Sequence, residues 1–473
     1  MAVSFIDRAK TCRQNHSPPC YALPLWPGTC IHLEKSPYSG AVVPASFFER
    51  HAGLAALASR DYRLLLLGST LVGMAMPLQF LTQIFWVQDN YPHRDVFYVG
   101  LIAGSRGVAM LVFSLLGGAI ADRFERRRVL LWCEVAALLL NGGVALLMLT
   151  NPFGDATIAA LIVFTFFAAG NMAIDMPARN AAIPAVVGMD HIGSAISLNM
   201  VAMQATFPLM VPVTGLVNDL FAPGHVYSAS LLAWAAIIPL IAALRFRDTG
   251  RGDRTAGVLR NIGQGLGYTR RDATIFAVIS LLILLQVVGM PGVATLGPVW
   301  MTDVLGLSKR EFGLIGMTWG LGTMIGSVFF AWRSALSPRG TTLCATVLTF
   351  AVAVVVFGHS RIIPVTAVAN FGLGFCLVGT TVSTSTIVQQ VVSDEMRGRV
   401  MSLFPLAMGL AMLSAVPIGA LGQAFGLEFI VPTLGWVMLG GAVVIIVSRP
   451  GLRGVQPGRT PPVQPTPTPA GAE

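Results

Sequence analysis

The chain has 473 residues, of which 54% are apolar and 11% are charged. A soluble domain carries about 25% charged residues, so this composition indicates an integral membrane protein and not a soluble enzyme or binding module. The net charge is +9, and nearly all of the excess is Arg. Because these Arg residues lie in short loops between apolar spans, we assign them to membrane topology and expect no nucleic-acid partner.

The two ends of the chain lack long apolar runs. Residues 1–60 are broken by Pro and have no signal-peptide core, which predicts a disordered cytoplasmic tail or a start site assigned too early. Residues 449–473 are rich in Pro and Thr and predict a second disordered tail. The six cysteines show no CxxC pair or zinc-like spacing, so we expect inert thiols, no metal site and no cofactor; they are Cys12, Cys20, Cys30, Cys133, Cys344 and Cys376.

Between these tails, twelve apolar spans approach the roughly 20 residues that a helix needs to cross a bilayer. Their predicted starts are near Tyr62, Val96, Val129, Asp155, Ser194, Val226, Ala273, Phe312, Thr341, Ile362, Ser402 and Phe429. Only helices are expected, because lipid offers no partner to open backbone groups. The fold class is therefore all-α integral membrane, with six-helix bundles at 61–244 and 273–448 joined by a cytoplasmic loop at 245–272.

The distribution of Lys and Arg predicts the orientation. Sixteen lie in the loops that follow even-numbered spans, and four lie in the loops on the opposite side. Since cytoplasmic loops carry the excess of positive charge, we expect both termini in the cytoplasm and a multi-pass protein of the inner (plasma) membrane.

The two bundles resemble each other in sequence. "VGLIAGSRG" at Val99–Gly107 recurs as "FGLIGMTWG" at Phe312–Gly320, and the segment Ile183–Leu198 recurs loosely at Val388–Leu403. Parallel repeats of this kind are typical of transporters that work by alternating access.

The loop between the second and third spans is unusually charged. "GGAIADRFERRRVLL" at Gly117–Leu131 resembles the signature loop of the major facilitator superfamily, with Glu125 in place of the usual second Gly. "DMPARNAAIPAVV", "PVWMTDVLGLS" and "DEMRGRVMSL" are similar to segments of its enterobactin-exporter-like, transmembrane secretion effector branch. The resemblance covers roughly residues 60 to 448 and implies two pseudo-symmetric six-helix bundles, the major facilitator fold.

The resemblance also implies a gating latch at this loop. Asp122, beside Arg123, is expected to lie against the start of helix 11 near Arg399 in the outward-open state, where a helix N-terminus stabilises a carboxylate. Arg126 is expected to pair with Asp175 at the inner end of helix 4. The alternative is that the Arg residues only enforce topology, although acids contribute little to orientation.

Ionisable groups inside a membrane span are functional candidates. Away from the outer helix ends we identify Arg106, Glu134 and Asp175. Arg106, near mid-depth, either binds an anionic or carbonyl-rich substrate or is satisfied by backbone carbonyls or Gln side chains. Glu134 either reaches the cytoplasmic surface, pairs with a loop Arg, or carries a proton; Asp175 is assigned to the latch.

Other polar residues within the spans are candidates for the substrate cavity or for bonds between helices. They are Gln79, Gln83, Asn199, Gln204, Gln286, Trp319 and Asn370. Many drug–proton antiporters of the superfamily carry an acid in helix 1, and this chain has none, so proton coupling stays open.

The pattern favours a secondary active exporter of a small amphiphilic molecule such as a siderophore, natural product or drug, with proton antiport as one form of coupling. An importer is the alternative. The sequence contains no GxxxxGK[ST] loop, which argues against ATP use. The scattered His argue against a membrane enzyme, and the two asymmetric halves argue against a channel. The expected partners are the small-molecule substrate, the lipid bilayer and protons, and we expect a monomer.

Overall fold

A computed structural model describes residues 52–188, 191–245, 258–333, 339–449 and 451–452. Within these ranges, the side chains at 52–53, 115–123, 204, 258–262, 333 and 339 lie outside the description. Twelve helices of the described residues are long and apolar enough to cross a membrane, by length and composition. Each predicted span start lies within about three residues of an observed helix start, so the predicted twelve-helix fold is confirmed.

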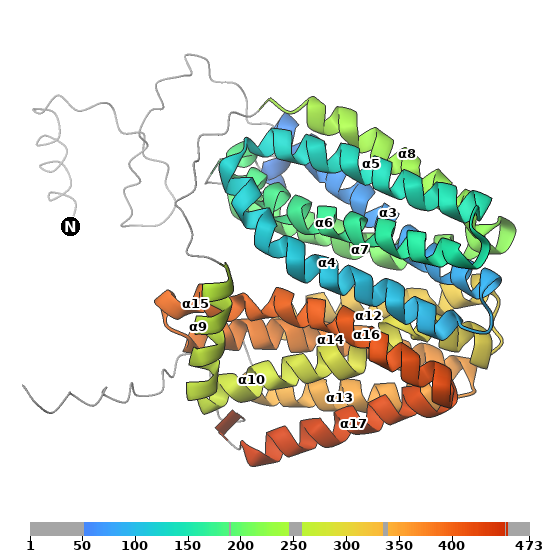
Figure 1. The fold of residues 1–473 in the computed structure, drawn as a ribbon. Helices are drawn as coiled ribbons and strands as arrows, with labels where there is room; N and C mark the ends of the chain where they lie inside the picture. Colours follow the sequence, from blue (N-terminus) through green and yellow to red (C-terminus); the bar gives the residue numbers. More distant parts are fainter. Residues whose placement is uncertain (1–51, 189–190, 246–257, 334–338, 450, 453–473) are drawn as a thin grey trace, which may run out of the picture. The chain divides into compact units, whose positions relative to one another are not determined.

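The described residues of the first half form six long helices (Figure 1). They are α3 (Arg60–Asn90), α4 (Asp95–Arg123), α5 (Arg126–Thr150), α6 (Thr157–Val187), α7 (Ile192–Leu220) and α8 (Pro223–Ala242). The 3-10 turn η2 (Gly154–Ala156) precedes α6. The 3-10 helix η1 (Ala52–Ala58) precedes α3 and is partly buried against this half, although the sequence placed these residues in the N-terminal tail.

The second half begins with an interrupted helix. The α10 helix (Ala273–Leu284) continues through the π-helical turns η4 (Leu285–Gly289) and η5 (Pro291–Thr295), the short α11 (Gly297–Val299) and the π-helical turn η6 (Trp300–Val304). The remaining helices are α12 (Lys309–Arg333), α13 (Arg339–His359), α14 (Ile363–Val391), α15 (Asp394–Met401), α16 (Leu403–Phe425) and α17 (Leu427–Ser448).

The predicted loop at 245–272 contains a helix. The α9 helix (Val258–Arg271) lies beside α15 in the second half (Figure 1). A Cβ atom at Gly265 would lie 2.3 Å from the carbonyl oxygen of Arg399, so the contact requires glycine. Asp272 then caps α10 by accepting from the backbone N–H groups of Thr274 and Ile275 at 2.8 and 2.9 Å.

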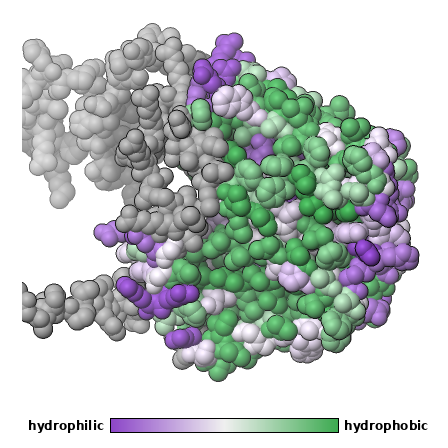
Figure 2. All heavy atoms as spheres, viewed as in Figure 1, coloured by the Kyte–Doolittle hydropathy of each residue, from purple (hydrophilic) through white to green (hydrophobic). Residues whose placement is uncertain are grey.

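Apolar side chains cover the outside of the described helices. Leu232 and Val368, for example, are 74% and 72% exposed. Figure 2 shows apolar residues over the middle of the visible face and hydrophilic ones toward its two ends. Exposed apolar surface on this scale suits a lipid environment and would be a liability in water.

Two helix pairs form the main contact between the halves. α4 packs on α16, and α7 packs on α12. A Cβ atom at Gly100 would lie 2.6 Å from the carbonyl oxygen of Ala415, and one at Gly320 would lie 2.4 Å from Pro208 Cβ. Gly100 on α4 and Gly320 on α12 therefore allow close packing between the halves.

Candidate functional site

A polar cluster surrounds Arg106 inside the first half. Arg106, on α4, is partly buried and donates from Nη2 to Gln83 Oε1 of α3. Its guanidinium also lies 4.9 Å from the centroid of the Phe80 ring, within cation–π range. Gln83 in turn donates to Thr165 Oγ1 of α6 at 3.2 Å. Among the described residues no carboxylate forms an ion pair with Arg106, so its positive charge is balanced only by neutral groups.

The two predicted Gln residues of α3 have different surroundings. Gln79 is buried and donates to Ser230 Oγ of α8 at 3.0 Å, which joins two helices. Gln83 is also buried but holds Arg106. Gln83 therefore orients the Arg106 guanidinium, whereas Gln79 is committed to α8.

The second-half candidates are not gathered in one place. Asn370 is buried and donates to the carbonyl oxygen of Ile315 and to Thr318 Oγ1, each at 3.1 Å, which joins α14 to α12. Gln286 lies in the π-helical turn η4, and its buried Oε1 has no hydrogen-bond partner among the described groups. Trp319 on α12 is partly exposed. In the first half, Asn199 on α7 is also partly exposed, and the side chain of Gln204 lies outside the described residues.

A buried charged triad joins α5 to α6. Arg179 donates from Nε to Asp175 Oδ2 at 3.0 Å and from Nη2 to Glu134 Oε1. All three residues are buried, with exposed fractions of 4%, 8% and 1% respectively. Glu134 Oε2 and Arg179 Nη1 have no described hydrogen-bond partner. Two carboxyl groups thus share one guanidinium, which leaves the triad one negative charge in excess when both acids are ionised.

Sequence reasoning missed Arg179. The count of cytoplasmic Lys and Arg included it in the loop after the fourth span, but α6 continues through Pro177 and Pro184 to Val187. The loop assignment was wrong because proline is tolerated in membrane helices, where neighbouring groups satisfy the freed carbonyls. The i,i+4 spacing of Asp175 and Arg179 was the signal that could have identified the pair.

The predicted latch is only partly described. The side chains of Asp122 and Arg123 lie outside the described residues. Arg126 Nη1 donates to the carbonyl oxygen of Ala181 at 2.9 Å, which places it against α6. Arg399, on α15, donates to Met396 Sδ at 3.1 Å. The Arg126–Asp175 pair stays a prediction, and the ion-pair partner found for Asp175 is Arg179.

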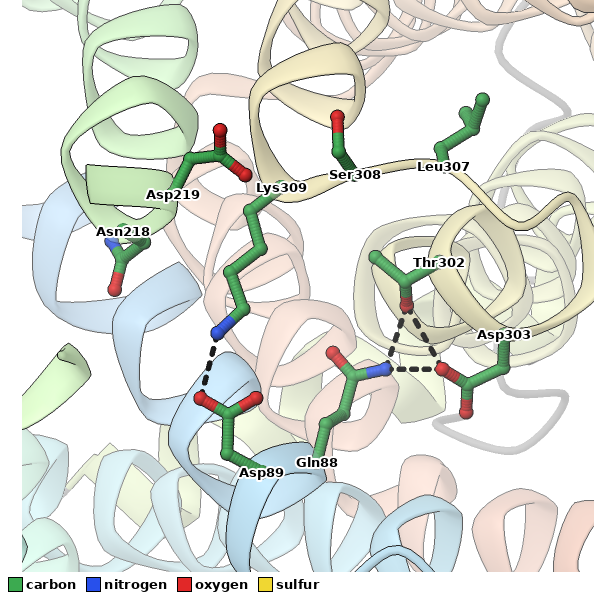
Figure 3. Close-up of a pocket in the computed structure, with 9 residues that line it drawn as sticks. All are labelled: Gln88, Asp89, Asn218, Asp219, Thr302, Asp303, Leu307, Ser308 and Lys309. Carbon is green, nitrogen blue, oxygen red and sulfur yellow. Dashed lines mark hydrogen bonds and ion pairs between the residues drawn. The ribbon is translucent and has the colours of Figure 1, made fainter. Parts of the chain in front are cut away.

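Polar contacts between the halves gather at one end of the molecule, which we call the closed end; it contains the end of α3 (Asn90) and the start of α12 (Lys309). Lys309 Nζ lies 2.6 Å from Asp89 Oδ2. Gln88 Nε2 donates to Thr302 Oγ1 at 2.6 Å and to Asp303 Oδ1 at 2.8 Å (Figure 3).

Other contacts support the closed end. Gln423 of α16 donates to the carbonyl oxygen of His93 at 2.9 Å and accepts from the Phe97 N–H at 3.4 Å. Ser308 and Glu311 form reciprocal hydrogen bonds of 2.9 and 3.2 Å, a capping box that starts α12 beside Lys309. A pocket of about 450 Å³ lies at this end, and its polar lining includes Gln88, Asp89, Asp303, Ser308 and Lys309 (Figure 3).

The helices, the polar core of the first half and the contacts at one end define a twelve-helix membrane transporter of the major facilitator fold. The chain belongs to the transmembrane secretion effector family, whose model matches residues 52–465. It is not an enzyme by family or fold. Among the described residues, no group of three His, Cys, Asp or Glu side chains could hold a metal ion.

Similar proteins extend this comparison. The multidrug efflux pump Tap of Mycolicibacterium fortuitum is 25% identical over 368 residues, which cover 75% of this chain and 87% of that protein. The staphyloferrin A transporter of Staphylococcus aureus is 20% identical over 338 residues, covering 71% and 83%. A crystal structure of the nucleoside transporter NupG matches with a TM-score of 0.65 at 12% identity, over 83% of this chain and 99% of that one.

Proposed function

We propose that the protein exports a small amphiphilic molecule that carries an anionic or carbonyl-rich group, and that Arg106 contacts this group. The observation that carries the proposal is Arg106, a partly buried residue whose guanidinium has no described ion-pair partner and is held by the neutral Gln83. A buried cation is costly unless something compensates it, and a substrate anion would do so. The similar efflux pump and siderophore transporter support export of drugs or siderophores.

Transport into inside-out membrane vesicles tests this proposal. Arg106→Ala should raise the KM for an acidic substrate at least tenfold, because a charge-assisted hydrogen bond contributes about 1.5–3 kcal/mol. Arg449→Ala, which removes an exposed Arg at the end of α17, is the matched control and should transport normally. Unchanged KM in Arg106→Ala would remove Arg106 from the site. Accumulation only in right-side-out vesicles would favour the importer.

The remaining polar candidates are expected to have different roles. Gln83 would orient Arg106, so Gln83→Ala should weaken binding of the same substrates. Gln79 and Asn370 each bond a neighbouring helix, so their replacement should lower stability more than affinity. To test whether the remaining candidates line the cavity, each is replaced by a single cysteine, and protection of that cysteine from a thiol reagent by the substrate is measured. These candidates are Asn199, Gln204, Gln286 and Trp319.

We further propose proton antiport, with Glu134 as the proton carrier. The excess negative charge of the Glu134–Arg179–Asp175 triad supports this assignment, because one proton would neutralise it. In proteoliposomes, Glu134→Gln should abolish substrate movement driven by a pH gradient while substrate exchange across equal pH continues. Glu125→Gln, on an exposed loop, is the control. Full gradient-driven transport in Glu134→Gln would reject Glu134 as the carrier.

We propose that the protein is a monomer in the inner (plasma) membrane. Both of its termini then lie in the cytoplasm. The closed end then faces outward. In a cysteine-free variant, a cysteine at exposed Phe153 should react with an impermeant thiol reagent from outside, and one at exposed His191 should not. The reverse labelling pattern would overturn the orientation. The molecular mass of the protein in detergent would test whether it is a monomer.

A further inference from the structure

A groove lies between α7 of the first half and α12 of the second half, near the closed end. The two helices are in close contact at its base: a Cβ atom at Gly215 would lie 2.4 Å from the carbonyl oxygen of Lys309, and one at Gly313 would lie 3.0 Å from Pro212 Cα. Because neither glycine has a side chain to fill the space beside this contact, the larger neighbours stand apart as two walls. The groove has a volume of about 230 Å³.

The walls of the groove are apolar and open to the surroundings of the protein. Val213 and Leu216 of α7 and Leu314 of α12 line it, together with Pro212. The first three are 44%, 40% and 53% exposed. Both helices are long and apolar enough to cross a membrane, so side chains that are exposed at this depth meet lipid acyl chains and not water. The walls therefore suit a hydrocarbon chain.

A single cation completes the lining. Arg310 is the second residue of α12 and is exposed. No carboxylate among the described residues forms an ion pair with it, whereas its neighbour Lys309 is paired with Asp89 at 2.6 Å. Leu314 lies one turn further along the helix, about 6 Å deeper. Arg310 is therefore at the level where a spanning helix ends and lipid headgroups begin.

The acids near this cation have other surroundings. Glu311 accepts from the backbone N–H and the hydroxyl of Ser308, and Asp219 lines the polar pocket that also contains Lys309. The described lining of the groove itself includes no acid. An anionic group in the groove would therefore meet one unpaired positive charge and no negative one among the lining residues.

We propose that this groove binds an anionic phospholipid of the leaflet at the closed end. The lipid phosphate accepts hydrogen bonds from the Arg310 guanidinium, whose planar fork matches phosphate oxygens, and one acyl chain lies against Val213, Leu216 and Leu314. Because α7 and α12 belong to different halves, the bound lipid contacts both. The site is separate from Arg106 and from Glu134, and it does not depend on the substrate or on the proposed direction of transport.

Native mass spectrometry of the purified full-length protein tests the proposal by measuring lipid binding. The protein in detergent is titrated with phosphatidylglycerol, with phosphatidylcholine of the same acyl chains, and with glycerol phosphate, which has no acyl chain. Phosphatidylglycerol should bind most tightly, because choline carries a positive charge of its own, and glycerol phosphate should not bind measurably. Equal affinity for the two phospholipids would overturn the assignment of an anionic lipid.

Variants of the two parts of the site locate the binding. Arg310→Gln should weaken phosphatidylglycerol binding about fivefold, the effect of one cation near an anionic headgroup, and should leave phosphatidylcholine binding unchanged. Leu216→Trp fills the groove and should weaken binding of both lipids. The matched controls are Arg94→Gln, an exposed Arg at the same end, and Val368→Trp, a 72% exposed position on α14; both should bind like the unchanged protein.

The proposal is overturned if Arg310→Gln binds phosphatidylglycerol like the unchanged protein, or if Arg94→Gln weakens binding as much as Arg310→Gln does. Normal binding by Leu216→Trp would reject the groove as the place of the acyl chain. The two variants change different helices, so poor folding of one leaves the other as the test.

Discussion

Removal of the Arg179 charge should destabilise the protein strongly. Arg179→Leu keeps a comparable apolar stem but leaves the Asp175 and Glu134 carboxylates without the guanidinium that now lies 3.0 Å from Asp175 and contacts Glu134. All three side chains are nearly inaccessible to water, so solvent cannot replace the lost charge. Breaking a buried ion pair by removing one partner costs about 3–5 kcal/mol, a factor of roughly 10² to 10⁴ in the unfolding equilibrium.

Thermal unfolding in detergent at neutral pH measures this effect. Arg179→Leu should lower Tm by several degrees or more, and adding Glu134→Gln and Asp175→Asn should restore most of the loss, because a neutral network needs no counter-charge. Arg128→Leu is the control: its ion pair with Glu125 is exposed, and such pairs contribute about 0–1 kcal/mol. Equal Tm values for Arg179→Leu and the unchanged protein would refute the charge-balance argument.

Three further substitutions test other contacts. Gly265→Val should displace α15 and reduce transport, since its Cβ would lie 2.3 Å from the Arg399 carbonyl oxygen; Gly267→Val, where nothing lies within 4 Å, is the control. Lys309→Ala should raise the open population of the closed end up to about fivefold, measured as the distance between spin labels on cysteines at exposed Phe153 and Ile362, because its partly exposed pair with Asp89 contributes at most about 1 kcal/mol. Asp122→Asn should reduce transport at normal expression if the loop is a latch; normal transport would leave only a topology signal.

The twelve helices could be predicted because each is a long apolar run, and lipid permits no other spanning structure. Exceptions arose where local composition was ambiguous. Val258–Arg271 has no long apolar run, yet it forms α9 because Gly265 allows a close fit against α15. The fit depends on a neighbour more than 100 residues away in sequence, which local patterns do not encode.

The candidate site could be predicted in type but not in pairing. A cation at mid-depth identified Arg106, and the i,i+4 spacing placed Gln79 and Gln83 on one face. Their partners could not be predicted, because Ser230 and Thr165 come from separate helices whose rotation is set by packing. A polar residue that binds a helix and one that binds a substrate have the same sequence signature.

Asp175 has two partners to account for. It forms an ion pair with Arg179 in the structure, and it is the predicted partner of Arg126 in the latch. In this structure, whose halves are joined at the closed end, Asp175 bonds Arg179 and Arg126 contacts the Ala181 carbonyl of the same helix. A pair between Arg126 and Asp175 would then belong to the opposite conformation, in which Asp175 shares its second oxygen or changes partner. Transport by Arg126→Ala, Asp175→Asn and their double variant tests this, with Tm measured in parallel. Partners in one contact are not additive, so the double variant should transport no worse than the poorer single variant. Strictly additive losses would separate Arg126 from Asp175 and assign Asp175 to Arg179 alone.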